Sequence, residues 1–199
     1  MKEIFRGLIL SIQLFTRIPL NIEINFSKKN INWAMFFFPL VGSLIGVIVG
    51  LCYFLLLEKS MLMAAAISFL LYLLLTGGLH LDGLSDMVDG FLSNKNKEET
   101  IKIMQDSFIG AFGVLSLISY SIIKVSLYAS VYKSTLFLIP LACMVSRLAT
   151  INLIFFSKLG PSGGFGKLIN DSIGKDKKFI LLTVFIIAIC LKINFKLII

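Results

Sequence analysis

Five long apolar runs, separated by short or polar stretches, dominate the pattern of this chain. They cover residues 35–57, 61–79, 108–132, 136–156 and 179–191, and the last can extend to residue 199. An α-helix needs about 20 mostly apolar residues to cross a bilayer. The pattern therefore predicts an all-α fold, a polytopic transmembrane helical bundle of about five spans that forms one integral membrane domain over residues 1–199.

A shorter apolar stretch at residues 4–18 has the pattern of an amphipathic helix. Phe5, Leu8, Ile12 and Phe15 recur at helical spacing, and basic residues flank them. The stretch lacks the small-residue cleavage pattern of a removable signal peptide. We therefore expect an N-terminal interfacial helix, which lies at the level of the lipid headgroups.

Composition agrees with a membrane protein, because 57% of the residues are hydrophobic and only 15% are charged. Thirteen Lys and Arg residues lie in the segments 1–34, 80–107 and 157–178, against Lys59 and Lys133 in the two short connections. This asymmetry predicts a multi-pass protein of the cell membrane with its N-terminus and both long loops in the cytoplasm. The net charge of +8 is better explained by these flanks than by nucleic-acid binding, for which no module is apparent.

A group of acidic residues directly follows the second apolar run. Asp82, Asp86 and Asp89 are spaced at i, i+4 and i+7, which places them within a sector of about 60° on a helix. Like charges this close repel unless protons or a cation neutralise them. Mg²⁺ is commonly held by one or two carboxylates together with the phosphates of a substrate. The spacing favours such a site, although a helix start with three solvated acids would have the same spacing.

Two glycines and a second polar group belong to the same region. Gly83 and Gly90 each follow an aspartate, where the missing Cβ would let backbone or ligand approach closely. Asp106 and Ser107 lie at a candidate helix N-terminus, where backbone amides can hold phosphate oxygens. Asp106 is better suited to a metal or a helix cap than to phosphate, and an ordinary cap would also explain both residues.

Two charged residues, Lys124 and Arg147, interrupt the apolar runs. A charge at the bilayer centre costs about 2.5–3.5 kcal/mol, so such residues usually face the protein interior and have partners. Arg147 lies near the middle of its run and could hold a diphosphate with two hydrogen bonds. Lys124 lies closer to a boundary and could reach the interface. The basic, glycine-rich loop 157–178 lacks the spacing of a phosphate-binding loop, and we expect a flexible loop over the site.

Two further patterns predict local structure. Gly42, Gly46 and Gly50 repeat every four residues in the first apolar run, and small residues at this spacing let transmembrane helices approach closely. We expect this face to pack on another helix. The segment 98–104 has the pattern of a short amphipathic helix.

With both acidic stretches in view, the chain resembles the cobalamin synthase family, the adenosylcobinamide-GDP ribazoletransferases. The resemblance rests mainly on the stretches at residues 76–86, with Asp89-Gly90, and 103–113. Weaker matches are found at residues 15–19, 38–42 and 146–147. All of these matches occur in the same order as in the family.

The resemblance implies a polytopic enzyme that joins adenosylcobinamide-GDP to α-ribazole, or to its 5′-phosphate, releases GMP and requires Mg²⁺. It places the acidic motif of the family on Asp82, Asp86 and Asp89, and its second acidic position on Asp106. We expect Asp82, Asp86 and Asp106 to hold Mg²⁺ on the diphosphate, with Asp89 as a further ligand or the base. The expected substrate-binding residues are Arg147, Ser107, Gly83 and Gly90.

Two departures from the family accompany this resemblance. Phe108 stands where family members often carry a basic residue, and the chain stops at Ile199 without the family's C-terminal Gly-Asp motif. We therefore expect a C-terminally short member.

Two other functions are compatible with the motifs. A CDP-alcohol phosphotransferase would carry a similar aspartate motif and bind cytidine nucleotides. A cation-coupled transporter would carry acidic residues within its spans, whereas here the aspartates lie at one cytoplasmic end.

Overall fold

The computed structural model describes residues 2–156, 165–174 and 176–198, and every regular element in them is helical. The helices are α1 (Lys2–Phe15), α2 (Lys28–Leu56), α3 (Met61–Thr76), α4 (Leu79–Leu92), α5 (Lys97–Met104), α6 (Ala111–Ala129), α7 (Leu138–Phe156), α8 (Phe165–Ile173) and α9 (Lys178–Ile198), with a short 3-10 helix, η1 (Lys133–Thr135), before α7. The predicted all-α fold is confirmed.

Three segments of the described residues are long and apolar enough to cross a membrane: α2, α6 and Lys133–Phe156, which ends with α7. Helices α3 and α4 qualify only as a pair, and the chain bends by 92° between them. Helix α9 provides a shorter apolar stretch, Lys178–Ala188. The chain is thus a membrane protein, but the predicted count of five spans is not confirmed, because the bend shortens the second run and the stretch in α9 is short.

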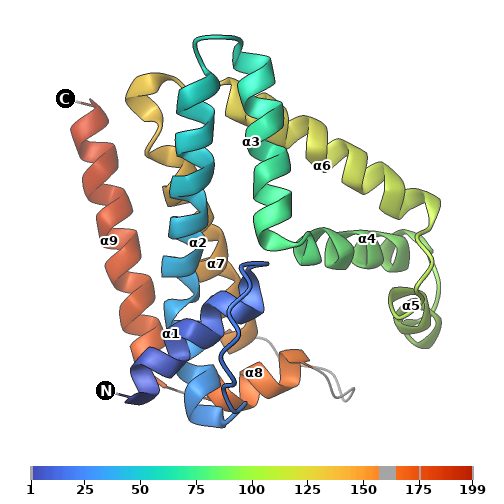
Figure 1. Ribbon diagram of the computed structural model, residues 1–199. Coiled ribbons are helices and arrows are strands. Elements are labelled where there is room, and N and C mark those ends of the chain that lie inside the picture. Colours follow the sequence, from blue (N-terminus) through green and yellow to red (C-terminus); the bar gives the residue numbers. More distant parts are fainter. Residues whose placement is uncertain (1, 157–164, 175, 199) are drawn as a thin grey trace. The chain divides into compact units, whose positions relative to one another are not determined.

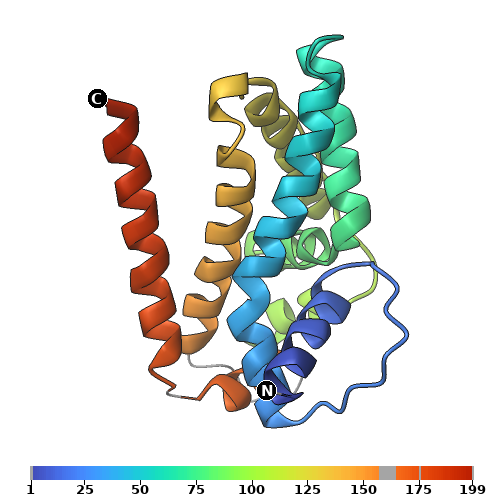
Figure 2. The ribbon, with the colours of Figure 1, turned by 60° about the vertical axis from the view of Figure 1, so that its left-hand side comes forward.

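The chain divides into two compact units, residues 1–48 with 137–199 and residues 49–136. In the first unit, α1 lies across the first turns of α2 (Figure 2), and the rings of Phe15 and Phe38 are 3.8 Å apart at their centroids. One face of α1 is buried, whereas Phe5 is 65% exposed. The core of this unit contains the following buried side chains: Leu10, Ile31, Ala34, Met35, Ile151, Ile169, Ile173 and Phe179.

The glycine stripe of α2 packs on α7 within the first unit. An ideal Cβ at Gly42 would lie 2.7 Å from Arg147 Cδ and 2.9 Å from the Cys143 carbonyl oxygen. At Gly46 the added atom would overlap the backbone of Pro140. The prediction that this face packs on another helix is confirmed at both glycines, since no larger side chain fits at this approach.

The second unit is built around α3, α4 and α6. Figure 1 shows α4 leaving the end of α3 at a steep angle and α6 running back diagonally from near the far end of α4 to cross behind α3, and α6 packs on both helices. The bend follows from Gly77 and Gly78, whose φ angles of 69° and 71° are in the left-handed region that favours glycine. The Gly77 amide closes α3 by donating to the Leu73 carbonyl oxygen at 2.8 Å. The bend therefore sets the direction of the acidic helix.

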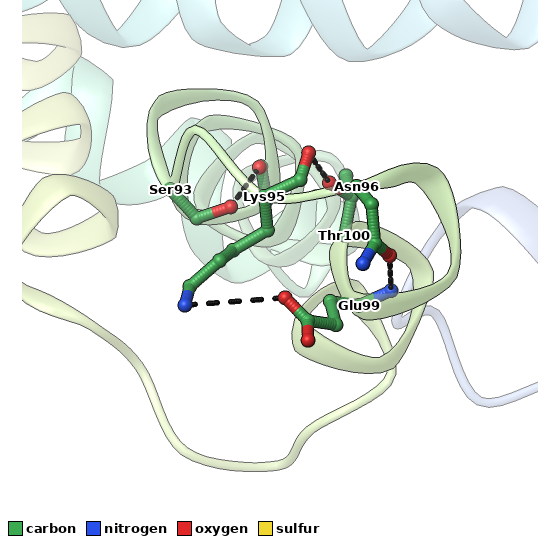
Figure 3. A network of polar contacts seen from close by, with 6 residues as sticks. Ser93, Lys95, Asn96, Glu99 and Thr100 are labelled. Atoms are coloured by element: carbon green, nitrogen blue, oxygen red, sulfur yellow. Dashed lines mark hydrogen bonds and ion pairs between the residues drawn. The ribbon is translucent and has the colours of Figure 1, made fainter.

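Helix α5 is attached to α4 by a short polar connection (Figure 3). The Asn96 side chain caps α5 by accepting from the Glu99 amide at 3.0 Å. The Thr100 hydroxyl donates to the Lys95 carbonyl oxygen at 3.3 Å, and the Ser93 hydroxyl donates back into α4. The predicted helix at 98–104 is confirmed, one residue longer at its start.

The predicted basic loop at 157–178 is only partly described, because residues 157–164 and 175 lie outside the described residues. The rest of it is not simply a loop. Helix α8 occupies Phe165–Ile173 and buries Ile169 and Ile173 in the core of the first unit. Phe165, Leu168, Ile169 and Ile173 recur at helical spacing, but the prediction missed this helix because glycines and lysines surround it.

Candidate active site

All three motif aspartates lie on α4, as the spacing predicts. Asp82 is in the first turn and is exposed, whereas Asp86 and Asp89 are half-buried. The helix starts at Gly78, which offers no side-chain cap, so its first backbone amides are not covered by a capping side chain. An acidic face thus begins directly after the bend between α3 and α4.

A pocket of about 310 Å³ opens beside the start of α4. Asp82 supplies its charged group, and Gly77, Gly78, Leu79 and Ser85 line the same side. Ile109 and Leu117 line it from α6 and the segment before it. The volume is at the lower end of ligand sites, which suits a group of diphosphate size rather than a whole large cofactor.

The charges on α4 influence one another. The pKa of Asp86 is raised above its ordinary value, first because partial burial disfavours the charged carboxylate and then because Asp82 and Asp89 carry like charges nearby. A cation placed between Asp82 and Asp86 would counteract both influences. The electrostatics therefore favour a cation or a proton at Asp86.

Asp89 is engaged differently from the other two aspartates. One carboxylate oxygen accepts from the Gly110 amide at 2.8 Å, and the other accepts from the Gly113 amide, also at 2.8 Å. Both donors lie at the N-terminus of α6. The carboxylate therefore joins the end of α4 to the start of α6.

The arrangement fits a Mg²⁺ site built on two carboxylates better than one built on four. In the described part of the chain, no group of three or more His, Cys, Asp or Glu side chains is close enough to hold one metal ion. Asp82 and Asp86, one turn apart on α4, match the one or two carboxylates that Mg²⁺ commonly takes beside phosphates. The roles predicted for Asp89 and Asp106 at the metal stay predictions.

The predicted helix N-terminus at Asp106 and Ser107 is wrong by several residues. The segment after α5 turns at Gln105 and bends at Ser107 and Phe108, and α6 begins at Ala111 with Gly110 as its N-cap. Asp106 and Ser107 are exposed, and Asp106 Oδ1 accepts from the Phe108 amide at 3.2 Å. The sequence suggested a local cap, but the cap of α6 comes from Asp89 on another helix.

The two motif glycines have different surroundings. An added Cβ at Gly83 would meet nothing within 4 Å, so space beside this residue is open. Gly90 is buried, and a Cβ there would contact the Met104 side chain of α5. The close approach that the sequence predicted at Gly90, by backbone or by a ligand, is therefore made by the neighbouring helix.

Arg147 belongs to the first unit, whereas the aspartates belong to the second. Its aliphatic stem lies over Gly42, and Nη1 donates to the Ser146 hydroxyl at 2.8 Å. Lys124 lies over the rings of Tyr72 and Tyr128, 5.6 and 5.4 Å from their centroids. Lys124 thus makes cation–π contacts within the second unit.

Of the residues that line the pocket, only Asp82 is among the site residues predicted from the sequence. Ser85 is buried at 1% exposure, and its hydroxyl donates to the Asp82 carbonyl oxygen at 2.8 Å. Ile109 and Leu117 reach the pocket only because α6 folds back along α4. The small residue Ser85 between two aspartates was an available signal, whereas the two apolar residues resemble any others in their run.

Comparison with known proteins gives a consistent result. The family model described as cobalamin-5-phosphate synthase matches residues 7–199. A Treponema denticola protein named adenosylcobinamide-GDP ribazoletransferase is 41% identical over 170 residues, which cover 85% of this chain and 65% of that protein. Proteins of the same name from Clostridium kluyveri and Clostridium botulinum are 36% and 38% identical, and each match covers 98% of this chain.

The relatives are longer than this chain. It spans 65% of the length of the Treponema denticola protein, and 79% and 78% of the two clostridial proteins. No solved structure matches this chain.

Proposed function

Because this chain belongs to the cobalamin-5-phosphate synthase family, we propose that it is an adenosylcobinamide-GDP ribazoletransferase of the cell membrane. It joins adenosylcobinamide-GDP to α-ribazole, or to α-ribazole 5′-phosphate, and releases GMP in cobalamin biosynthesis. The family match over residues 7–199 is the observation that carries the proposal. The three named relatives support it with 36–41% identity.

The proposed reaction is the displacement of GMP from a diphosphate. A ribose hydroxyl oxygen of α-ribazole bonds to the cobinamide-side phosphorus, and the bond from that phosphorus to the bridging oxygen breaks. GMP leaves with the bridging oxygen, and the hydroxyl proton passes to a base or to water. Such a transfer depends mainly on positioning and on neutralising the negative charge of the phosphates.

We assign Asp82 and Asp86 as the residues that hold Mg²⁺. When bound, this ion would neutralise phosphate charge at the diphosphate. The exposed Asp82 carboxylate on the pocket and the raised pKa of Asp86 support this assignment. Asp106 remains the predicted further ligand, and Ser107 and Arg147 remain predicted phosphate contacts.

The pocket size suggests which part of the substrate it takes. A volume of about 310 Å³ cannot hold a corrinoid, but it can hold a diphosphate. The uncapped amides at the start of α4 and the two preceding glycines would then face phosphate oxygens. We propose that the corrinoid and the guanosine extend outside this pocket.

We also propose that α4, α5 and the N-terminus lie on the cytoplasmic side. The support is the excess of Lys and Arg in residues 1–34, 80–107 and 157–178. A cysteine-labelling experiment tests this orientation. Ser93 is replaced by cysteine in a variant without the native cysteines, and the protein is treated with a membrane-impermeant reagent. Labelling of intact cells at Ser93 would refute it.

The decisive experiment is Mg²⁺-dependent GMP release from adenosylcobinamide-GDP in membranes that contain this chain, with and without α-ribazole. Release should require α-ribazole, and Asp86→Asn should abolish it while leaving the protein inserted. Glu98→Gln is the matched control, because Glu98 is an exposed acid of α5. Near-normal turnover of Asp86→Asn would refute the site, and absence of release from inserted wild-type protein would refute the activity for this chain.

A further inference from the structure

The N-terminus of α6 depends on a side chain from another helix. Its N-cap, Gly110, has no side chain to accept from the first free amides of the helix. Asp89 supplies acceptors for two amides at this helix end, those of Gly110 and Gly113, each at 2.8 Å. Short side chains that accept from the first turn are the usual caps of helices, but they normally come from the N-cap residue itself.

The absence of a side chain at Gly110 and at Gly113 leaves room for the Asp89 carboxylate. An ideal Cβ at Gly110 would lie 2.8 Å from Asp89 Cγ, and one at Gly113 would lie 3.0 Å from the same atom. In both cases the added atom would overlap a carboxylate oxygen. The carboxylate thus occupies the space that any larger residue would need, and it is held on two sides.

We propose that Asp89 is a positioning residue, which clamps α6 onto α4 through the Gly110 and Gly113 amides, rather than a metal ligand or the catalytic base. A carboxylate is better suited to this contact than a neutral side chain. Its negative charge strengthens both hydrogen bonds and is attracted to the positive end of the α6 dipole. Its two oxygens match two donors that lie three residues apart on one helix end.

Both partners of the clamp, Asp89 and Gly110, lie close in sequence to residues of the candidate site. Asp89 follows Asp86 by three residues on α4, and Ile109 directly precedes the clamped Gly110. Ile109 and Leu117 form the α6 side of the pocket, opposite Asp82. Loss of the clamp would therefore release one wall of the pocket while leaving Asp82 and Asp86 in place.

The first test is amide hydrogen exchange on the purified 199-residue chain in detergent, which does not depend on the proposed function. Asp89→Asn replaces one acceptor with an amide donor, so exchange at Gly110 and Gly113 should accelerate by about tenfold or more. Asp86→Asn is the matched control, because it makes the same change one turn earlier, at a carboxylate that accepts no hydrogen bond from α6 in the described residues. It should leave these amides within about twofold of wild type.

The second test separates a clamp from a metal ligand, and it rests on the proposed function. Asp89→Asn should lower kcat/KM without changing the Mg²⁺ concentration that gives half-maximal turnover. Gly113→Ala should reproduce the faster exchange and the kinetic loss, because its Cβ displaces the same carboxylate. The double variant should then be no worse than either single variant, since both remove one interaction.

Several outcomes would overturn the proposal. Unchanged exchange at Gly110 and Gly113 in Asp89→Asn would show that the carboxylate does not protect α6. A tenfold higher Mg²⁺ requirement would show that Asp89 is a ligand, and additive losses in the double variant would separate Asp89 from Gly113. If Asp89→Asn does not fold, amide exchange at Gly110 in the Gly113→Ala variant tests the clamp in its place. If wild-type protein lacks transferase activity, exchange alone still tests the clamp.

Discussion

Gly83 and Gly90 provide a matched pair for testing how the acidic helix meets its surroundings. Each follows an aspartate in the motif, and each lies inside α4. The structure leaves open space beside Gly83 but packs Gly90 against Met104 of α5. Alanine at the two positions should therefore have opposite effects on stability.

The expected magnitudes follow from these contacts. Gly83→Ala meets nothing within 4 Å, so it should gain the helix preference of alanine, about 0.5–1 kcal/mol. Gly90→Ala has the same gain but overpacks α5, which costs about 1–3 kcal/mol and leaves a net loss of up to about 2.5 kcal/mol. For a chain of this size the unfolding temperature should rise by about 1–4 °C in the first variant and fall by up to about 10 °C in the second.

Thermal unfolding in detergent and steady-state GMP release together provide the assay. If substrate uses the open side of α4, Gly83→Ala should raise the KM for adenosylcobinamide-GDP by about fivefold or more, because an added methyl then overpacks the complex. Gly90→Ala should leave KM within about twofold. A destabilised Gly83→Ala protein would refute the assignment of open space, and an unchanged KM would show that substrate does not approach this residue.

Three further predictions follow from contacts away from the acidic helix. Gly46→Ala should lower unfolding stability by about 1–3 kcal/mol in a detergent unfolding assay, because the added methyl overlaps the backbone of α7. Tyr53→Phe should cost about 1 kcal/mol in the same assay, since the buried hydroxyl donates to the Val131 carbonyl oxygen at 3.0 Å. The pKa of Glu58 is lowered because Lys133 donates a hydrogen bond and places a positive charge beside it. The stabilisation by this ion pair should therefore be present at pH values above 4.5, the ordinary pKa of Glu58, and be lost as the pH falls through the lowered pKa. The small difference in unfolding stability between wild type and Lys133→Ala should then shrink on acidification.

Local patterns in the sequence predicted much of this architecture. The all-helical fold, the single helix that carries Asp82, Asp86 and Asp89, and the packing of Gly42 and Gly46 are confirmed. These features depend on spacing along one helix, where the period of 3.6 residues relates sequence to geometry directly.

Features that depend on distant pairs were not predicted. Asp89 meets amides that lie 21 and 24 residues further along the chain, and the sequence offered Asp106 and Ser107 as closer candidates for the same helix end. Hydrogen-bonding capacity alone does not identify which carboxylate reaches a given amide. The choice depends on how α4 and α6 pack, and that in turn depends on the bend before α4.

The bend at Gly77 and Gly78 also bears on the order of events during synthesis. It needs only two backbone conformations and one hydrogen bond within α3, so residues 61–92 can adopt their final course while the ribosome is still making α6. The acidic helix would then already be in place when residues 110–113 emerge. Closure of Asp89 onto those amides would follow the placement of α4, and a nascent chain halted before residue 110 would carry Asp89 without the amides that hold it.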